Sequence, residues 1–344
     1  MQASGMDAFR KRQVGGTTLF LPQFGMGGAS LGDMHAVIPE ARAEATIEAA
    51  HAAGIGYFDT SPWYGNTKSE LRLGHVLRVK PRDSFVLSTK LGRVHARPAN
   101  PDTYRHPAWA GGLPFEPHFD YSRDGILKSY EMSLARLGIS RVDALLIHDL
   151  DPGHLGAGDG VANAFGQLAR GGFDALADLK ARGEIQAIGA GVNRVGMIPQ
   201  FLARFAIDFF LVAMPYTLLD QSGLDELDLC RQRGVSVVIG APFASGILVQ
   251  GPGADAHYGY RPAKPPILDK ARRLQAICAR HDVPLAAAAL RFPFGHPSVI
   301  SVIPGPNAPQ QLRQNLDWMG LPIPAELWAE LHHEGLIHTA APTP

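Results

Sequence analysis

The sequence has little of what marks secreted, membrane-spanning or nucleic-acid-binding proteins. Among its 344 residues only Cys230 and Cys278 are cysteines, and because they form no C-x-x-C pair we expect buried thiols in a reducing compartment. No stretch approaches the roughly 20 apolar residues that span a bilayer, and the opening MQASGMDAFRKRQ lacks an apolar signal core. The 32 basic and 32 acidic residues leave no net charge to attract nucleic acid or an anionic surface. We therefore expect a cytoplasmic protein with a small-molecule substrate, no nucleic acid and no membrane partner, while nothing predicts its oligomeric state.

Several familiar catalytic motifs are missing as well. The sequence contains no G-x-S-x-G and no phosphate-binding P-loop. The stretch HHE at 332–334, with His338, does not have the H-E-x-x-H spacing of a zinc site, so we predict no metal. The nearest approach to the dinucleotide-binding G-x-G-x-x-G is GAG at 189–191, which has Arg194 where the third glycine belongs. A doubly wound sheet is therefore disfavoured.

What the chain does contain is a regular alternation of apolar runs and helical patterns. A hairpin pattern at residues 12–21, around two glycines, precedes eight runs typical of buried strands. These runs are residues 24–28, 55–58, 85–90, 142–147, 185–191, 209–214, 235–239 and 299–303. Helical spacing follows at residues 41–53, 67–77, 122–137, 173–182, 197–205, 224–233, 267–281, 285–292 and 309–318. Eight such repeats without a linker predict a single-domain (β/α)8 TIM barrel over residues 1–344, with its core at about 21–335.

Two connections are unusually long, and we expect them at the C-terminal face of the barrel. Residues 92–121 and 149–172 are rich in Gly, Pro, His and aromatic residues. Loops of this length in a compact domain are usually lids or binding loops, with surface insertions as the alternative. At the start of the second helix, Thr67 or Ser69 is the expected cap.

Ionisable side chains stand where three of the expected strands end. Asp59, Lys90 and His148 end strands two, three and four, and Tyr64 follows Asp59 in the next loop. Because strand ends in a barrel face one pocket, we expect the four side chains to meet. A nearby ammonium favours a phenolate, so Lys90 is expected to lower the pKa of Tyr64 while Asp59 keeps Lys90 charged. Tyr64 then acts as general acid or base on a substrate oxygen that His148 also hydrogen-bonds, which suits hydride transfer between a carbonyl and an alcohol.

Each of these residues has a purely structural explanation when taken alone. Asp59 is then best explained as a turn cap, His148 as a satisfied core histidine and Tyr64 as a packing residue. Lys90 resists such an explanation, because lysine is almost never buried without a partner. The functional interpretation therefore depends on the four residues together.

Six motifs together resemble those of the aldo-keto reductases, from about residue 21 to the C-terminal helix. They are FDTSPWYGNTKSELRLG, LSTKLG, SLARLGISRVDALLIH, LKARGEIQAIG, PYTLLDQ and SVIPGPNAPQQLRQN. The resemblance implies a (β/α)8 barrel without a Rossmann domain, a nicotinamide dinucleotide extended across its C-terminal face, and a catalytic tetrad. The tetrad implied is Asp59, Tyr64, Lys90 and His148. The residues implied at the cofactor are Gly28 and Asp59, Asn193 near the carboxamide, Pro242, Phe243, Ser245 and Gly246 along the pyrophosphate, and Gly305, Gln311 and Asn315 around the adenosine.

Two departures from the family pattern bear on the cofactor. Gly240 stands where many members have an aromatic residue stacked on the nicotinamide, so that stacking must be replaced or absent. Around the adenosine, Gly305, Pro306 and Gln311 stand in place of the lysine, serine and arginine that usually hold a 2′-phosphate. Without charge-assisted contacts to the 2′-phosphate dianion, the site has no preference for NADP, so we predict NAD as the cofactor. Arg313, two positions after Gln311, is the alternative source of such a contact.

Within the family, the chain is most similar to the NAD-dependent sugar 1-dehydrogenases of the D-threo-aldose or L-fucose type. This similarity lies in HDLDP, GAGVN, Gly240 and the ending LPIPAELWAELHHEGLI. It implies oxidation of a cyclic hemiacetal hydroxyl to a lactone, with Tyr64 as general base. The pyridoxal 4-dehydrogenase pattern, for an enzyme that forms 4-pyridoxolactone, is also similar. Two further alternatives are an NADPH-dependent aldehyde reductase, which the missing basic residues oppose, and a non-catalytic cofactor-sensing subunit, which the intact tetrad opposes.

The candidates for substrate contact are aromatic. Trp63 lies beside Tyr64 in sequence, and Trp109, Phe115 and Phe119 belong to the long third loop. We expect Trp63, Trp109 and Phe119 to form a wall for the apolar face of a sugar or a pyridine ring, with packing at the loop base as the alternative. No cluster of basic residues near them indicates a phosphorylated substrate.

Overall fold

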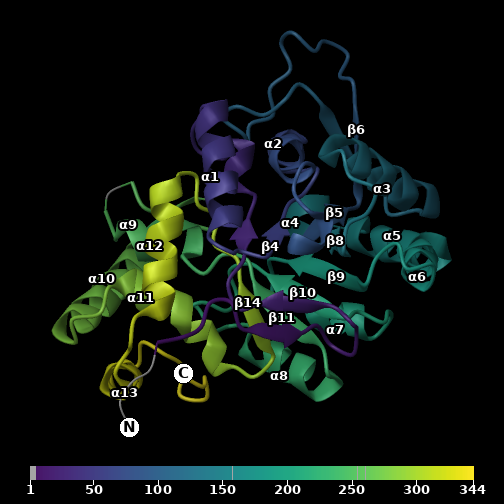
Figure 1. The fold of residues 1–344 in the computed structure, drawn as a ribbon. Helices are drawn as coiled ribbons and strands as arrows, with labels where there is room; N and C mark the ends of the chain where they lie inside the picture. The colour runs from purple at the N-terminus through teal and green to yellow at the C-terminus, as the bar shows by residue number, and fades with distance from the viewer. Residues whose placement is uncertain (1–4, 157, 254, 260) are drawn as a thin grey trace.

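A curved sheet of eight parallel strands forms the centre of the computed structural model, which describes residues 5–344 apart from 157, 254 and 260 (Figure 1). The strands are neighbours in the order β14-β11-β10-β9-β8-β5-β4-β3. They are β3 (Met26–Gly27), β4 (Tyr57–Asp59), β5 (Val86–Leu91), β8 (Ala144–His148), β9 (Ala187–Val192), β10 (Phe209–Val212), β11 (Ser236–Ile239) and β14 (Val299–Val302). The predicted strand order along the chain is thus retained in space.

The two edges of this sheet are joined to each other. Phe24 and Val302 form a parallel bridge. The N–H of Gly25 donates to the carbonyl oxygen of Val302 at 3.0 Å, and that of Gly27 to Pro304 at 2.9 Å. The strands therefore close into a ring, and the predicted (β/α)8 barrel is confirmed.

Helices surround the strands on all sides in Figure 1. The main helices are α1 (Glu40–Ala52), α2 (Lys68–Leu77), α3 (Arg123–Leu137), α6 (Phe173–Ala181), α7 (Met197–Leu202), α8 (Leu224–Arg233), α10 (Pro265–Arg280), α11 (Leu285–Arg291), α12 (Pro309–Gly320) and α13 (Ala325–His333). Shorter turns of helix are η1 (Ser30–Gly32), η2 (Arg82–Ser84), η4 (Ala244–Gly246), α9 (Ile247–Gln250) and η5 (Phe292–Gly295). In the described part of the chain, no helix combines the length and the apolar content needed to cross a bilayer.

The two-residue repeat of the strands sorts the apolar side chains into two cores. Phe58, Leu145 and Ile147 belong to the larger core, which also includes residues of the surrounding helices. The alternate positions fill the inside of the barrel, and we call this second cluster the barrel plug. It consists of Val14, Leu19, Leu21, Tyr57, Ala144, Leu146, Ala187, Phe209, Leu211, Val238, Ile300 and Ile303. Because Asp59 and His148 lie two residues beyond plug residues on the same strands, their side chains point into the barrel above the plug.

A hairpin closes the floor of the barrel, as the sequence predicts. β1 (Lys11–Gln13) and β2 (Phe20–Pro22) pair antiparallel, and the turn between them contributes to the barrel plug. The N–H of Gly15 donates to Ser236 Oγ at 2.8 Å. A Cβ at Gly15, which has a φ of +49°, would lie 2.8 Å from the carbonyl oxygen of Asp208, so the turn requires glycine. Access to the barrel interior is therefore from the opposite, C-terminal end.

The two long connections contain more regular structure than predicted. In the first, β6 (Arg93–Ala96) and β7 (Glu116–Phe119) pair antiparallel into a ribbon. The second is largely helical, with α4 (Pro152–Leu155), α5 (Gly160–Gln167) and the wide turn η3 (Leu168–Gly172). These helices were not predicted, because glycines interrupt the helical pattern of the sequence. The one available signal was Asp151 followed by a proline, which is a typical helix start. A smaller ribbon, β12 (His257–Tyr258) with β13 (Arg261–Pro262), lies in the connection after β11.

The expected cap of α2 is wrong for both candidates. Thr67 precedes the helix with a φ of 84° and makes no capping hydrogen bond. Ser69 lies inside the helix, and its Oγ donates instead to the carbonyl oxygen of Gly28 at 2.8 Å. This bond fixes the loop after β3 to α2, and so fixes one wall of the barrel mouth.

Candidate active site

Asp59 and Lys90 form a buried ion pair at the ends of neighbouring strands. Lys90 Nζ lies 2.5 Å from Asp59 Oδ2 and 2.9 Å from the carbonyl oxygen of Thr60. Ser88 Oγ donates to the other carboxylate oxygen of Asp59 at 2.7 Å. Both members of the pair are 1% exposed, and burial raises the pKa of Asp59 while Lys90 and Ser88 oppose that rise. The predicted partner of the buried lysine is therefore in place.

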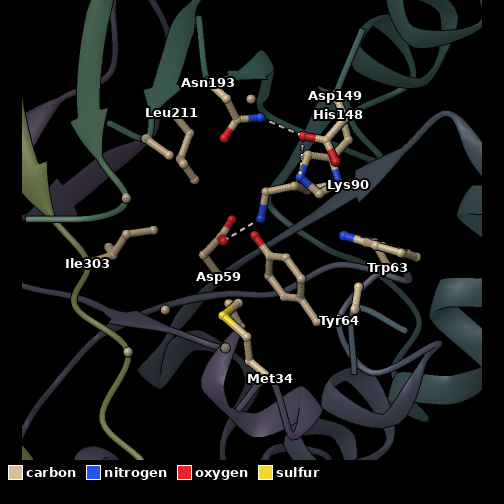
Figure 2. Close-up of a pocket in the computed structure, with 18 of the residues that line it drawn as sticks. Met34, Asp59, Trp63, Tyr64, Lys90, His148, Asp149, Asn193, Leu211 and Ile303 are labelled. Atoms are coloured by element: carbon tan, nitrogen blue, oxygen red, sulfur yellow. Dashed lines mark hydrogen bonds and ion pairs between the residues drawn. The ribbon is translucent and has the colours of Figure 1, made fainter. Parts of the chain in front are cut away.

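Tyr64 points its hydroxyl toward this pair (Figure 2). The Lys90 ammonium lies 4.6 Å from the centre of the Tyr64 ring, a cation–π distance. Burial raises the pKa of Tyr64 well above its usual 10, the charges of Asp59 and Asp149 raise it further, and Arg93 opposes them. The lowering expected from Lys90 is not found, because Asp59 neutralises the ammonium and burial penalises the phenolate. Tyr64 is therefore a neutral phenol at neutral pH and needs additional positive charge to act as a base.

His148 faces Tyr64 with its ring nearly perpendicular to the phenol. The two ring centres are 5.8 Å apart. Ser61 Oγ lies 3.1 Å from His148 Nδ1, and the Tyr121 hydroxyl donates to the His148 carbonyl oxygen at 2.7 Å. Burial lowers the pKa of His148 well below its usual 6.5, so the imidazole is neutral. Gly191 is its register neighbour on β9, and a Cβ there would lie 3.2 Å from the ring, so the glycine makes room for the imidazole.

These four side chains stand at one end of a cavity of about 420 Å³. The cavity is lined by Gly27, Gly28, Ala29, Met34, His35, Asp59, Trp63, Tyr64, Lys90, Pro107, Ala108, Trp109, His148, Asp149, His154, Gly191, Val192, Asn193, Leu211, Ala213, Gly240, Ile303 and Gly305. The structure thus brings together the whole predicted tetrad. The cavity is at the small end of ligand pockets, which range from about 300 to 1,000 Å³.

Two of the three predicted substrate aromatics belong to the cavity wall. The rings of Trp63 and Trp109 meet edge to face, 5.3 Å apart between centres. The nitrogen end of the Trp63 indole points into the cavity (Figure 2). Phe119 and Phe115 do not line the cavity. Phe119 is instead held in the β6–β7 ribbon, where its ring covers the guanidinium of Arg93 at 4.4 Å.

The predicted cofactor residues fall into two groups. Gly28, Asp59, Asn193 and Gly305 line the cavity. Pro242, Phe243, Ser245 and Gly246 lie in the turn after β11, and Gln311 and Asn315 lie on α12, outside the cavity lining. The ring of Phe243 contacts that of Trp318 on α12, 6.2 Å between centres, so the turn after β11 packs against this helix. Asn315 is 4% exposed.

The turn after β11 has a strained backbone. Ala244, Ser245 and Gly246 have successive positive φ angles of 47°, 62° and 97°. Left-handed backbone at non-glycine residues costs about 1–3 kcal/mol each and is characteristic of functional sites. The N–H groups of Ala244 and Gly246 donate at 2.9 Å to the carbonyl oxygens of Ala241 and Phe243, so the turn satisfies these two groups itself. The role of this turn at the pyrophosphate of a dinucleotide stays a prediction.

Leu211 explains why an aromatic residue is missing at Gly240. A Cβ at Gly240 would lie 2.5 Å from Leu211 Cδ2, so the leucine already fills the space into which a side chain at 240 would grow. Leu211 lines the cavity and is part of the barrel plug. The structure thus has an aliphatic side chain beside the position where many family members have an aromatic one.

Sequence reasoning missed two charged residues next to the tetrad, Arg93 and Asp149. Arg93 Nη1 donates to Asp149 Oδ2 at 2.8 Å, and the exposed fractions of the two residues are 5% and 3%. The sequence signal that could have found them is their closeness to tetrad residues. Arg93 follows Lys90 by three residues, and Asp149 follows His148 directly. Arg93 lies just outside the motif LSTKLG, and Asp149 belongs to HDLDP, which indicates a branch of the family and no role for the aspartate.

Asp149, Asp151 and His154 bring their ligand atoms within 4.8 Å of one another, a spacing that a metal ion can use. Asp149 already accepts a hydrogen bond from Arg93, and Arg194 Nε lies 3.5 Å from Asp151. Both carboxylates therefore already have a cationic partner. The absence of a metal stays a prediction.

Comparison with known proteins agrees with this geometry. The sequence profile of the Aldo/keto reductase family matches residues 23–333. The chain is 40% identical to a pyridoxal 4-dehydrogenase of Microbacterium luteolum, over 96% of this chain and 99% of that protein. It is 38% identical to a D-threo-aldose 1-dehydrogenase of a Pseudomonas species, over 93% of this chain and 96% of that protein. A solved aldo-keto reductase of Bacillus halodurans, in its holo form, superposes with a TM-score of 0.74 at 25% identity, covering 97% of this chain and 98% of the other.

Proposed function

Because the chain belongs to the aldo/keto reductase family, whose members are oxidoreductases that use nicotinamide cofactors, we propose that it is an NAD-dependent dehydrogenase that oxidises the hemiacetal hydroxyl of a free aldose to a lactone. The observation that carries this proposal is the buried set of Asp59, Tyr64, Lys90 and His148 at the end of a small cavity with a tryptophan wall. Among the described residues that line the cavity, Lys90 is the one lysine or arginine, and Asp59 neutralises it. An uncharged ring therefore suits the cavity better than a phosphorylated one.

In this proposal Tyr64 removes the hydroxyl proton and His148 hydrogen-bonds the same oxygen. His148 is neutral, so it donates without competing for the proton that Tyr64 takes. Lys90, kept charged by Asp59, stabilises negative charge that develops on the phenol oxygen. When bound, the oxidised dinucleotide supplies the hydride acceptor and a positive charge beside Tyr64.

The preference for NAD is supported by the surface of α12. Gln311 Oε1 accepts a hydrogen bond from the N–H of Asn307 at 2.9 Å, so this side chain is uncharged and engaged with the loop. Arg313 lies about 200° around the helix from Gln311, because each residue advances about 100°. It therefore does not replace the arginine that a 2′-phosphate requires at position 311.

Pyridoxal is the second candidate substrate. The observation in its favour is the 40% identity to a pyridoxal 4-dehydrogenase over nearly the whole chain. Pyridoxal also forms a ring hemiacetal, through its neighbouring hydroxymethyl group, so the same side chains can oxidise it in the same way. The tryptophan wall accepts either a sugar face or a pyridine ring.

The deciding experiment follows NADH formation with L-fucose, D-arabinose, L-galactose and pyridoxal, each repeated with NADP. The proposal expects rapid turnover of at least one sugar with NAD. Turnover of pyridoxal alone would move the protein to the second candidate, and a higher kcat/KM with NADP would contradict the cofactor assignment. Tight cofactor binding without turnover of any substrate would indicate a cofactor-sensing protein.

Tyr64→Phe is the control for the chemistry. It removes the proton acceptor and keeps the ring that packs on Lys90. Turnover should fall by about 10²- to 10⁴-fold, the usual contribution of an acid–base group. Because burial raises the pKa of Tyr64, wild-type kcat/KM for oxidation should rise with pH through the neutral range. A flat pH profile, or near-normal turnover in the variant, would show that Tyr64 is not the base.

A further inference from the structure

Arg93 is a buried cation placed directly behind the tetrad. Its guanidinium lies between two aromatic rings, 4.6 Å from the centre of Trp63 and 4.4 Å from that of Phe119. It does not line the cavity, so it is not placed to bind a substrate. Burying a charge is costly unless it is paired, and the partner here is Asp149 at 2.8 Å. A surface role and a direct substrate role are both excluded by this position.

Arg93 and Ser61 together determine which ring nitrogen of His148 carries the proton. Arg93 Nη1 lies 3.5 Å from His148 Nδ1, and Ser61 Oγ lies 3.1 Å from the same atom. A guanidinium has only N–H donors, so the nitrogen that faces it must be an acceptor. The proton of the neutral imidazole is therefore on Nε2. Nε2 lies 3.5 Å from Asp149 Oδ1, and it is the ring nitrogen that has a proton to donate to a substrate oxygen.

Asp149 joins this histidine to the cofactor side of the cavity. Its Oδ2 accepts from Arg93, and its Oδ1 accepts from Asn193 Nδ2 at 2.8 Å (Figure 2). Asp149 has a φ of 53°, a left-handed conformation that costs about 1–3 kcal/mol outside glycine. This strained backbone places one carboxylate between the ends of β8 and β9. The Asp149 carboxylate therefore fixes the orientation of both the His148 ring and the Asn193 amide.

We propose that Arg93 and Asp149 are positioning residues whose ion pair fixes His148 as the Nε2–H tautomer and, through the second carboxylate oxygen, fixes the amide of Asn193. The inference rests on the proposed function, because His148 and Asn193 serve substrate and cofactor only in a nicotinamide-dependent enzyme. It extends that function by coupling the two sites through one carboxylate. The charged and titratable groups around Tyr64 that bear on its ionisation are Asp59, Lys90, Arg93, His148 and Asp149.

The test compares Asp149→Asn with Asp151→Asn. Asparagine tolerates the left-handed backbone at 149 but cannot pair with the Arg93 charge. Asp151 is also buried, lies two residues away and caps α4 through its side chain, a task that asparagine performs equally well. The control therefore removes a neighbouring carboxylate without touching Arg93 or Asn193. Arg93→Lys is the second variant, since it keeps the charge and loses the rigid guanidinium whose Nη1 reaches both Asp149 and His148.

Three measurements apply to each variant. The 15N spectrum of the imidazoles, with His148 assigned from His148→Gln, should show wild-type protonation on Nε2 and a mixture of tautomers in Asp149→Asn and Arg93→Lys. The Kd for NADH should rise in Asp149→Asn. kcat/KM should fall about 10- to 100-fold, as when a partner that orients a reactive histidine is removed. The acidic limb of its pH profile should move to lower pH, because the Asp149 charge no longer opposes ionisation of Tyr64.

The outcomes separate the inference from the proposed function. If Asp149→Asn matches Asp151→Asn in all three measurements, the inference is overturned. It is also overturned if activity falls while the imidazole spectrum, the NADH Kd and the pH limb stay unchanged, since that pattern indicates a merely structural role. If the wild-type protein oxidises none of the sugars or pyridoxal, the proposed function fails, and the spectrum and the NADH Kd still decide the positioning role.

Discussion

Lys90 has two separable roles, in stability and in catalysis. Lys90→Met leaves the buried Asp59 carboxylate without its partner, and breaking a buried pair in this way costs about 3–5 kcal/mol in the free energy of unfolding. The double variant Asp59→Leu with Lys90→Met removes both charges, so stability should return to within about 1–2 kcal/mol of wild type. Turnover should stay lost in both variants. Urea unfolding and NADH formation measure the two effects.

The contrast between these two variants is decisive. A double variant as unstable as the single one would show that packing, not charge, dominates at this position. A single variant that keeps its turnover would remove Lys90 from the proposed chemistry.

At the scale of residues, the sequence predicted the tetrad because three of its members interrupt apolar strand ends and Tyr64 follows one of them in the next loop. Asp59, Lys90 and His148 are polar groups where burial is expected, so they require an explanation. Arg93 and Asp149 are equally buried, but each follows a tetrad residue at the start of a loop, where charged residues are ordinary. The prediction that Phe119 lines the cavity was wrong. Its position in the sequence does not show that β6 and β7 pair into a ribbon, and this ribbon holds its side chain elsewhere.

Two loops meet across the mouth of the cavity through a pair of histidines. His35, in the loop after β3, lines the cavity, and its ring centre lies 5.7 Å from that of His257 on β12. We expect His257→Ala to speed NADH release, because the ribbon then loses its contact with the opposite loop. Stopped-flow displacement of NADH measures this rate, with His333→Ala on the exposed side of α13 as the control.

The same contact should depend on pH. Burial and the neighbouring His257 lower the pKa of His35, so the His35 ring is neutral at neutral pH and the contact is complete. As the pH falls below 6.5, protonation of His35 is favoured more in the open state than in this contact, so the contact weakens. NADH release from the wild-type protein should therefore accelerate on acidification. A release rate that does not change with pH or with His257→Ala would show that these loops do not hold the cofactor.

At the scale of elements, the strands were predictable and the connections were not. The eight strands are apolar runs between turn residues, and burial on both faces makes such runs easy to recognise. The cap of α2 was not predictable, because Ser69 bonds to Gly28, 41 residues away in the chain. The pairing of β6 with β7 likewise depends on contacts across a 19-residue gap that carry no local signal.

Over the whole molecule, buried neutral histidines should make the fold sensitive to acid. His95 is 6% exposed, neither of its ring nitrogens has a hydrogen-bond partner within the described residues, and burial lowers its pKa to about 3. The unfolded chain takes up a proton near pH 6.5, whereas the folded one does not until about pH 3. Stability is therefore complete above pH 6.5 and falls below it, by about 1.4 kcal/mol per pH unit for one such group. His148 contributes in the same direction.

Urea unfolding at about pH 7.5, 6 and 5 measures this slope. His95→Leu should raise stability at the lowest pH and reduce the slope by about one proton, because leucine fills the site without a polar atom. An unchanged slope in His95→Leu would mean that His95 is already protonated in the folded protein.

The closed floor of the barrel has a practical consequence for anyone who wishes to reshape this protein. Asp59, Lys90 and His148 stand on strands that the barrel plug anchors, whereas Pro107, Ala108 and Trp109 belong to an insert between β6 and β7. The insert also holds the Tyr64 loop, because Trp109 contacts the Tyr64 ring and the N–H of Leu113 donates to the carbonyl oxygen of Gly65 at 2.9 Å. A library in residues 97–115 that keeps Trp109 and Leu113 therefore varies the substrate wall and preserves the contacts that place the reacting residues.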